Sequence, residues 1–376
     1  MTILIAGDYS PKDRISALIA EGKTQDIFAD IKQSLFESDY SIVNFESVVI
    51  SANSKLIKKA GPGMHCTAKA VELLKITGFD AVTLANNHFR DYGDEGVNNS
   101  IREFEKNKID YFGGGQNIEE AERVFYKNIA GKQVAFINVC EHEFSIATEN
   151  RGGSAPLNVI DVSLRIEAAK EKADYVIVII HGGNEHYQLP SPRMKKTYRF
   201  FVKMGADAVV NHHQHCFSGY EVYMGKPIVY GLGNFCFDWK GRRNSIWNEG
   251  CMVKLLLDNE VSFEVIPYIQ CDKEPIVVRM QGDRQSVFEN RILELNQIII
   301  NDVLLDKEYD SFCKRRKRSV LSSFTPYFSS YTRIASAHRL LPLLIPKKKL
   351  LAQTGLIKCE SHRDVLIKAL NDELER

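Results

Sequence analysis

Several features that would place this 376-residue chain in a special class of protein are missing from its sequence. The eight cysteines lie far apart and include no Cys-x-x-Cys pair, which excludes a zinc ribbon and a compact disulfide framework. The formal net charge is only +1, so overall charge gives no reason to expect a nucleic-acid partner. What remains is an ordinary globular composition with 44% hydrophobic and 26% charged residues.

Long hydrophobic runs are missing too. No window reaches the roughly 18 uninterrupted apolar residues of a membrane-spanning helix, and the nearest candidate, LLPLLIPKKKLL, contains two prolines. The first ten residues, MTILIAGDYS, show no basic start, no leader-length apolar core and no small-residue cleavage site. The sequence therefore predicts a cytoplasmic protein without a transmembrane segment.

The sequence does contain a regular alternation of apolar runs and helix-like patterns. Apolar runs of strand length occupy residues 2–7, 40–45, 80–86, 132–140, 175–180 and 207–211. Amphipathic stretches with a helical period occupy residues 26–38, 67–78, 95–108, 163–172 and 192–205. Strands that are apolar on both faces and alternate with helices predict an α/β fold, with a layered sheet covered by helices.

The last third of the chain has a different pattern. Consecutive strands that look antiparallel fill residues 216–279, and helical patterns with basic clusters at 314–318 and 347–349 follow. We therefore predict an α/β domain over residues 1–280 and a helical C-terminal region over residues 281–376. The cluster at 314–318 predicts a solvated helix face, and contact with a membrane surface or a partner is the alternative.

Polar side chains that can bind metals follow almost every predicted strand. In open α/β sheets, ligands gather at the carboxyl ends of the strands. The side chains found there belong to Asp8, Glu46, Asn87, His88, Asp91, His181, Glu185, His212, His213 and His215. Taken singly, each carboxylate or amide is more simply explained by a turn or a helix cap, and His181 is explained equally well as a buried strand-end histidine. Together they supply the ligands of a two-metal hydrolytic site.

The order of these residues resembles a known family. The motifs are Gly7-Asp8, Asn44-x-Glu46, Asn86-Asn87-His88-x-x-Asp91, His181-Gly-Gly-x-Glu185, His212-His213-x-His215 and Gly233-Asn234-Phe235-x-Phe237-Asp238. Over about residues 1–270 they resemble the capsule-synthesis CapA (PGA_cap) family, which is similar in turn to the calcineurin-like metallophosphoesterases. The resemblance implies a layered β-sandwich core flanked by helices, with a helical appendage at the C-terminus.

The resemblance also implies a role for each motif residue. One divalent ion (Mn, Fe or Zn) would be bound by Asp8, Glu46 and His215. A second would be bound by Glu46, Asn87, His181 and His213, so that Glu46 bridges the two. His88 would be the general acid or an electrostatic stabiliser of phosphoryl oxygens, and Asp91 would orient it. The residues expected to contact substrate are Glu185, Asn234 and His212.

Three positions depart from the phosphoesterase pattern. The first strand ends in Asp8-Tyr9-Ser10, whereas phosphoesterases usually have Asp-x-His there. The second motif has Glu46 where an aspartate is usual, and Asn211 replaces the usual glycine before the histidine pair. The first ion therefore lacks a ligand unless Glu185 or water replaces it. One ion, two ions and none are all compatible with the sequence.

Two functions follow from these observations. The first is a metal-dependent hydrolase that acts on an anionic small molecule or polymer, through a phosphoester or an amide bond. The second is a non-catalytic or regulatory component of surface-polymer synthesis with a degenerate metal site. In both cases the resemblance implies a link to capsule or poly-γ-glutamate formation, and a possible partner is the assembly that synthesises the polymer.

Two further segments have open interpretations. KKAGPGMHC (58–66) is a basic, glycine-rich loop that could reach over an anionic substrate, or it is a flexible solvent-exposed loop. EHEF (141–144) follows a predicted strand, and His142 within it either lines the cleft or has no active role.

Overall fold

The computed structural model of the chain describes residues 1–59, 61–322 and 330–342, with residues 346, 350, 353, 354, 357, 370 and 374. It contains two compact units, Met1–Asp306 and Lys307–Arg376. The basic cluster at 347–349 lies outside the described residues, and the cluster at 314–318 lies on a helix of the second unit. The predicted domain boundary at residue 280 stays a prediction.

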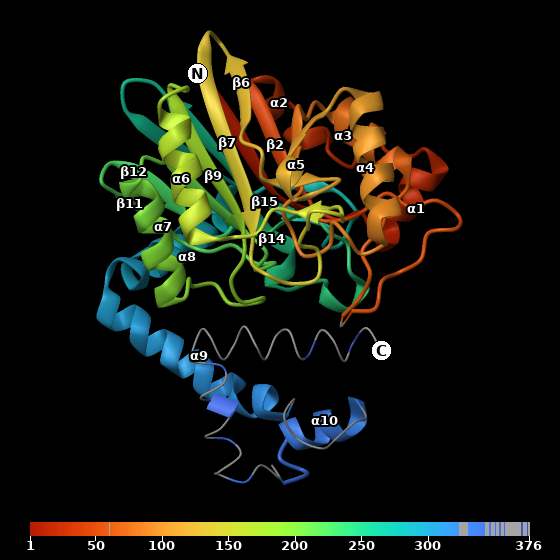
Figure 1. Ribbon diagram of the computed structural model, residues 1–376, viewed down its shortest axis with the longest axis vertical. Helices are drawn as coiled ribbons and strands as arrows, with labels where there is room; N and C mark the ends of the chain where they lie inside the picture. The colour runs from red at the N-terminus through yellow and green to blue at the C-terminus, as the bar shows by residue number, and fades with distance from the viewer. Residues whose placement is uncertain are drawn as a thin grey trace. The chain divides into compact units, whose positions relative to one another are not determined.

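Two β-sheets form the centre of the first unit (Figure 1). In spatial order the first sheet contains β16 (Val277–Arg279), β15 (Val261–Gln270), β14 (Glu249–Leu257), β1 (Thr2–Tyr9), β2 (Tyr40–Phe45), β3 (Ala81–Thr83) and β4 (Asp110–Phe112), and β13 (Asn234–Cys236) pairs with β1. In spatial order the second sheet contains β11 (Tyr220–Tyr223), β12 (Lys226–Val229), β10 (Ala208–His212), β9 (Tyr175–His181), β7 (Lys132–Cys140) and β6 (Phe125–Ile129). A small ladder joins β5 (Gly114–Gly115) to β8 (Gly153–Ser154).

Helices flank the two sheets. They are α1 (Asp13–Glu21), α2 (Lys32–Phe36), α3 (Ala68–Thr77), α4 (Gly93–Asn107), α5 (Ile118–Glu122), α6 (Val159–Lys170), α7 (Pro192–Lys203) and α8 (Gly282–Ile300). Helix α9 (Asp302–Ser322) begins at the end of the first unit and continues into the second unit, which also contains α10 (Ser330–Ala337). Short 3-10 turns span Ala29–Ile31, Lys240–Arg242 and Ile246–Asn248. Figure 1 shows α1, α3 and α4 on the side of the first sheet, and α6 and α7 on the side of the second. The predicted fold class, α/β with a layered core flanked by helices, is confirmed.

The strand pattern explains why the core is buried on both faces. Every residue of β2 is buried, and β1 is buried from Ile3 onward, so neither strand shows the alternation of a solvent-facing sheet. Strands β1 to β4 are parallel to one another, as are β7, β9 and β10. The carboxyl ends of each parallel set therefore meet at one edge of its sheet.

Two sequence predictions need correction. The strands after residue 215 are only partly antiparallel, because β12 lies parallel to β10 and β13 lies parallel to β1. The helix predicted over 26–38 is replaced by a 3-10 turn and the five-residue helix α2. One reason is that the carbonyl of Ile27 accepts a hydrogen bond from the backbone N–H of Val277 at 2.8 Å, which ties this segment to β16.

The C-terminal elements of the first unit pack on the second sheet. The ring of Phe288 on α8 lies 4.2 Å from that of Phe217, and Asn296 accepts a hydrogen bond from the backbone N–H of Tyr220 at 2.7 Å. In the part of the chain that the structure describes, every helix is too short or too polar to cross a membrane.

Candidate metal centre

Residues from both sheets meet at the carboxyl ends of the parallel strands. Asp8 lies near the end of β1 and Glu46 directly follows β2, while His181 and His212 are the last residues of β9 and β10. All four are at most 2% exposed. Side chains from two sheets, separated by more than two hundred positions, thus share one buried space.

Two glycines allow the close approach of the strands beside this space. A Cβ atom on Gly7 would lie 2.1 Å from the carbonyl oxygen of Gly233, so only glycine fits there. Gly233 itself has a left-handed φ of +76°. The contact brings Asp8 and Asn234 into register, and the Asn234 Oδ1 lies 2.8 Å from Nδ1 of His215. Asn234 therefore fixes the orientation of the His215 ring.

Glu46 occupies the middle of the cluster. Its side chain is fully buried, and neither carboxylate oxygen forms a hydrogen bond with any described residue. Its Oε1 lies 3.8 Å from Nε2 of His88, of His181 and of His215. These distances are too long for hydrogen bonds, but those to His181 and His215 suit ligands that share a cation with bonds of about 2.1 Å. Burial and the neighbouring Asp8 raise the pKa of Glu46 well above its usual range.

The ligand atoms fall into two groups that share Glu46. One contains Glu46, His181 and His213, and the other contains Asp8, Glu46 and His215, with ligand atoms within 4.8 Å of one another in each. Asn87 joins the first group, because its Oδ1 lies 3.1 Å from Nε2 of His181. The donor set of buried carboxylates, imidazoles and an amide oxygen fits one or two divalent cations.

The electrostatics of the cluster favour the metal-binding forms of Asp8, His181 and His215. Burial and the nearby His213 lower the pKa of His181, and burial lowers the pKa of His215 to about 4, so both rings are neutral near pH 7. Burial would raise the pKa of Asp8, but His212 and the other imidazoles outweigh it and lower that pKa. Ionised carboxylates and neutral imidazoles are the forms that bind cations.

The first-strand aspartate is held by groups from both sheets. Asn44 on β2 donates a hydrogen bond to Oδ1 of Asp8 at 2.7 Å, and the backbone N–H of His213 donates to Oδ2 at 3.3 Å. Nδ1 of His212 lies 3.3 Å from Oδ1, so this ring packs against Asp8 and is itself only 2% exposed. His213 and His215 both adopt left-handed backbone conformations, with φ of 95° and 55°, which turn their side chains toward the cluster from one loop.

His88 and Asp91 form a buried pair at the edge of the cluster. Nδ1 of His88 lies 2.7 Å from Oδ2 of Asp91, and the opposite ring nitrogen, Nε2, faces Glu46. Asp91 is fully buried and also accepts a hydrogen bond from the backbone N–H of Met64 at 2.8 Å. The ring of His88 is therefore fixed on one side and directed toward the candidate metal ligands on the other.

Glu185 lies on the loop after β9, with half of its side chain exposed. Partial burial would raise its pKa, but the nearby His215 and His213 outweigh that effect and lower it. This carboxylate therefore lies close enough to the imidazoles to interact with them from the solvent side. Its neighbour His186 has its ring centroid 6.1 Å from that of His215.

The sequence reasoning missed two residues of the cluster. Lys59 forms an ion pair with Asp91, and its Nζ lies 3.1 Å from Nδ1 of His88. Glu143 lies 3.7 Å from Nε2 of His213 and accepts a hydrogen bond from Asn87 at 3.3 Å. Both belong to segments with open interpretations, 58–66 and 141–144. Within the second segment Glu143 reaches the cluster, whereas His142 is exposed.

Asp238, the last residue of the final motif, has a structural explanation. Arg14 donates to its carboxylate through Nε and Nη2, each at 2.9 Å, and Arg243 donates at 2.9 and 2.8 Å. Two guanidinium groups thus occupy both carboxylate oxygens of a side chain that is fully buried.

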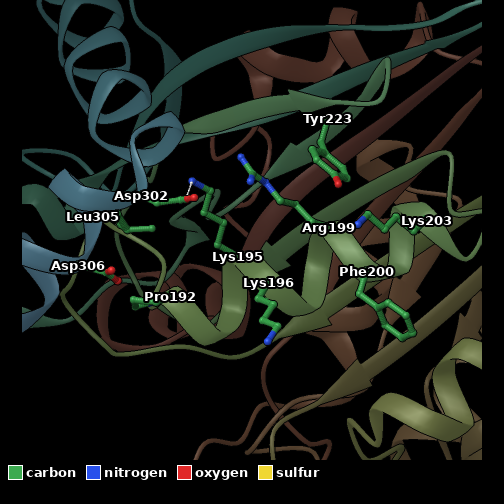
Figure 2. A pocket seen from close by; sticks show the side chains of 10 residues that line it. All are labelled: Pro192, Lys195, Lys196, Arg199, Phe200, Lys203, Tyr223, Asp302, Leu305 and Asp306. Atoms are coloured by element: carbon green, nitrogen blue, oxygen red, sulfur yellow. Dashed lines mark hydrogen bonds and ion pairs between the residues drawn. The ribbon is translucent and has the colours of Figure 1, made fainter.

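A second polar region lies along α7, where a cavity of about 470 Å³ opens beside Tyr223 and the first residues of α9 (Figure 2). Its buried cation, Lys195, lies 2.5 Å from Asp302. Arg199 donates to Glu221 at 2.9 Å and stacks over the ring of Tyr223 at 4.8 Å. These pairs fasten α7 to its neighbours, and none of the described residues lining the cavity is a predicted site residue.

Known proteins resemble this chain over most of its first unit. Residues 2–239 match the model of the family described as bacterial capsule synthesis protein PGA_cap. The "Capsule biosynthesis protein CapA" of Bacillus anthracis is 33% identical over 298 residues, which cover 77% of this chain and 72% of that protein. The "PGA biosynthesis protein CapA" of Bacillus subtilis is 34% identical over 277 residues, which cover 71% of each.

Two solved structures superpose on this chain at low sequence identity. A putative 5'-nucleotidase from Staphylococcus aureus superposes with a TM-score of 0.46 at 14% identity, covering 78% of this chain and 58% of that chain. A hypothetical protein from Thermus thermophilus superposes with a TM-score of 0.46 at 15% identity, covering 71% of this chain and 99% of that chain.

Proposed function

The chain belongs to the PGA_cap family of bacterial capsule synthesis proteins, and from this premise we propose that it is a metal-dependent hydrolase in surface-polymer biosynthesis. Two relatives are named for capsule and PGA biosynthesis, and a Mycobacterium tuberculosis relative is named a probable polyglutamine synthesis accessory protein. We propose polyglutamate or another anionic surface polymer as the product of the process in which it acts. The bond that it cleaves is a phosphoester.

One observation carries the proposal. A buried carboxylate, Glu46, has no hydrogen bond to any described residue and lies 3.8 Å from Nε2 of three different histidines. A buried, unpaired carboxylate is costly to a folded protein, so its retention in this space needs a compensating ligand. A cation coordinated by Glu46 together with His181 or His215 would compensate for that cost.

The chain's own residues divide the work of the reaction. Asp8, Glu46, Asn87, His181, His213 and His215 would bind one or two divalent ions, which supply Lewis-acid polarisation of a phosphoryl oxygen when bound. His88 presents Nε2 to the same space and would donate to an oxygen of the substrate, while Asp91 holds the ring in place. Glu185 and Asn234 border the space from the loop after β9 and from β13.

Metal content and hydrolysis test the proposal together. The purified protein is expected to contain about one to two equivalents of Mn, Fe or Zn per chain and to hydrolyse an aryl phosphate. His213→Ala and Asp8→Asn should each lower metal content and turnover while the far-UV circular dichroism spectrum stays unchanged. His142→Ala, which removes an exposed histidine near the cluster, is the matched control and should change neither.

A non-catalytic role is the second candidate, and one position favours it. Ser10 occupies the place of the histidine in the phosphoesterase pattern, and its buried hydroxyl has no hydrogen-bond partner among the described residues. Bound metal without turnover of any phosphoester would support this candidate. Absence of bound metal after reconstitution with each of the three ions would contradict the hydrolase proposal outright.

A further inference from the structure

The two tryptophans of the chain, Trp239 and Trp247, lie together beside the candidate metal centre. Their ring centroids are 5.6 Å apart, and the ring of Trp247 lies 4.6 Å from that of His215. Trp247 is only 3% exposed, and its indole N–H donates to the carbonyl of Phe237 at 2.7 Å. Trp247 therefore forms a fixed side of the centre, and the half-buried Trp239 extends this side toward the solvent.

Three cations accompany this pair of indoles. The ammonium of Lys12 lies 4.5 Å from the ring centroid of Trp239, and the guanidinium of Arg242 lies 5.9 Å from that of Trp247. Lys240, which is exposed, directly follows Trp239. We call Lys12 together with residues 239–247 the rim. Within the described part of the chain, none of the three cations forms an ion pair with a carboxylate.

The carboxylates near the rim hold its backbone and its other cation in place. Asp13 accepts a hydrogen bond from the backbone N–H of Lys240 at 2.8 Å, and Asp272 accepts one from that of Asn244 at 3.1 Å. Both oxygens of Asp238 are occupied by two arginines. The rim is thus ordered without a ligand, which lowers the entropy cost of binding one.

The loop after β9 carries the opposite charge on the other side of Trp247. The ring of His186 lies 5.8 Å from that of Trp247, and the neighbouring Glu185 has half of its side chain exposed. A negatively charged ligand would be repelled by Glu185 and attracted by Lys12 and Arg242. An anionic chain that enters the candidate metal centre is therefore expected to lie along the rim.

We propose that the rim is a substrate-binding site for a carboxylate-bearing chain, such as an acidic peptide, that adjoins the phosphoester to be cleaved. The proposal rests on the proposed function for the identity of the reacting group. Cations supported by aromatic rings keep their N–H donors available for carboxylates. Three such cations spread along one surface suit several carboxylates in sequence better than a single charge. Arg242, which is separated from His215 by one indole ring, would bind the carboxylate nearest the centre.

Tryptophan fluorescence tests the proposal without any activity, because both tryptophans of the chain belong to the rim. The probe is hexaglutamate, titrated into the purified protein at neutral pH and low ionic strength. We expect a saturable change in emission, whereas hexaglutamine should cause none. Arg242→Ala and Lys12→Ala, which keep both tryptophans, should each weaken binding of hexaglutamate by about fivefold or more.

Three controls separate the rim from other sources of binding. Lys203→Gln removes an exposed lysine of α7 that has no ion pair among the described residues, and it should change the affinity by less than about twofold. Arg242→Lys keeps the charge and should retain most of the affinity. Repeating the titration after treatment with a chelator shows whether a bound ion contributes, and binding by the rim should persist.

The proposal would be overturned if the wild-type protein gave no saturable change, or if Arg242→Ala bound hexaglutamate as tightly as the wild type. An equal loss of affinity in Lys203→Gln, or binding that disappears with the chelator, would also overturn it. Binding of tripolyphosphate but not of hexaglutamate would contradict the choice of a carboxylate ligand. Absence of turnover in the wild-type protein would remove the proposed function, while the titration would still decide whether the rim binds the acidic chain.

Discussion

Glu46 and Asp238 are both fully buried carboxylates near the ends of strands, but their surroundings differ completely. Asp238 receives hydrogen bonds from two arginines on both of its oxygens. Glu46 receives none from the described residues and faces three imidazoles at a common distance of 3.8 Å. The carboxylate that supports the fold is thus neutralised by arginines, whereas the one that faces the imidazoles has no hydrogen bond from the described residues.

The same contrast separates the candidate metal centre from the cavity along α7. In that cavity the buried charge of Lys195 and the half-buried charge of Arg199 each have a carboxylate partner, Asp302 or Glu221. Residue type and burial alone would rank both regions as functional candidates. Whether each buried charge is matched by a fixed partner is the feature that distinguishes them.

The largest expected effect comes from Glu46→Gln. Turnover of an aryl phosphate should fall by at least about 1000-fold, and bound metal should be lost, because the shared ligand of both groups is removed. Without metal, the free energy of unfolding of Glu46→Gln at pH 7 should exceed that of the metal-free wild type by about 1 kcal/mol, because a costly buried carboxylate is replaced by a neutral amide. Elemental analysis and urea unfolding after chelation measure the two effects. A metal-free variant that is clearly less stable than the wild type would break the comparison.

Asp238→Asn should have the opposite profile. It leaves Arg14 and Arg243 without a charged partner, so the free energy of unfolding should fall by about 3 kcal/mol. Metal content per folded chain should stay unchanged. Asp26→Asn, at an exposed position, is the control and should change stability by less than about 0.5 kcal/mol. Loss of metal together with retained stability would assign Asp238 to the centre instead.

The pH dependence of stability gives the smallest and sharpest contrast. Burial would raise the pKa of Asp238, but Arg14 and Arg243 outweigh it and lower that pKa. Its stabilising contribution is therefore present above the unfolded-state pKa of about 3.9 and is lost as pH falls through the lower folded value. Burial raises the pKa of Glu46, so its cost to metal-free protein appears above about pH 4.3 and grows with pH.

Unfolding curves from pH 3 to pH 8 would reveal these trends. The stability difference between wild type and Asp238→Asn should shrink below about pH 4. The difference between metal-free wild type and Glu46→Gln should instead grow toward neutral pH, in favour of the variant. Parallel trends for the two pairs would show that both carboxylates are equally compensated.

Much of the arrangement followed from the sequence because the relevant strands are parallel. Residues at the ends of such strands meet at one edge of their sheet whatever the details of the helices between them, so Asp8 and Glu46 could be brought together on pattern alone. His181 ends a strand of the second sheet, and the strand pattern does not state how the edges of two sheets face each other. The prediction of a helix over 26–38 was wrong because the first part of this segment is hydrogen-bonded to β16, some 250 residues later. A local sequence pattern contains no information about such a distant contact.

The rest of the site depended on loops. Lys59 and Glu143 reach the cluster from segments without periodic structure, and nothing in their spacing states where those segments fold. The part played by Asp238 depends on Arg14, which lies 224 positions earlier in the chain. Such contacts are fixed by tertiary packing, which a motif order alone does not reveal.

The candidate ligands come from opposite layers of the sandwich: Asp8 and Glu46 from the first sheet, His181 and His213 from the second. An ion held between them would cross-link the two sheets through its coordination bonds. Neither sheet could bind the ion alone if the two moved apart. A chelator would therefore weaken the association of the two sheets as well as removing the ion. Removal of the ion would then lower both the activity and the stability of the packing between the sheets.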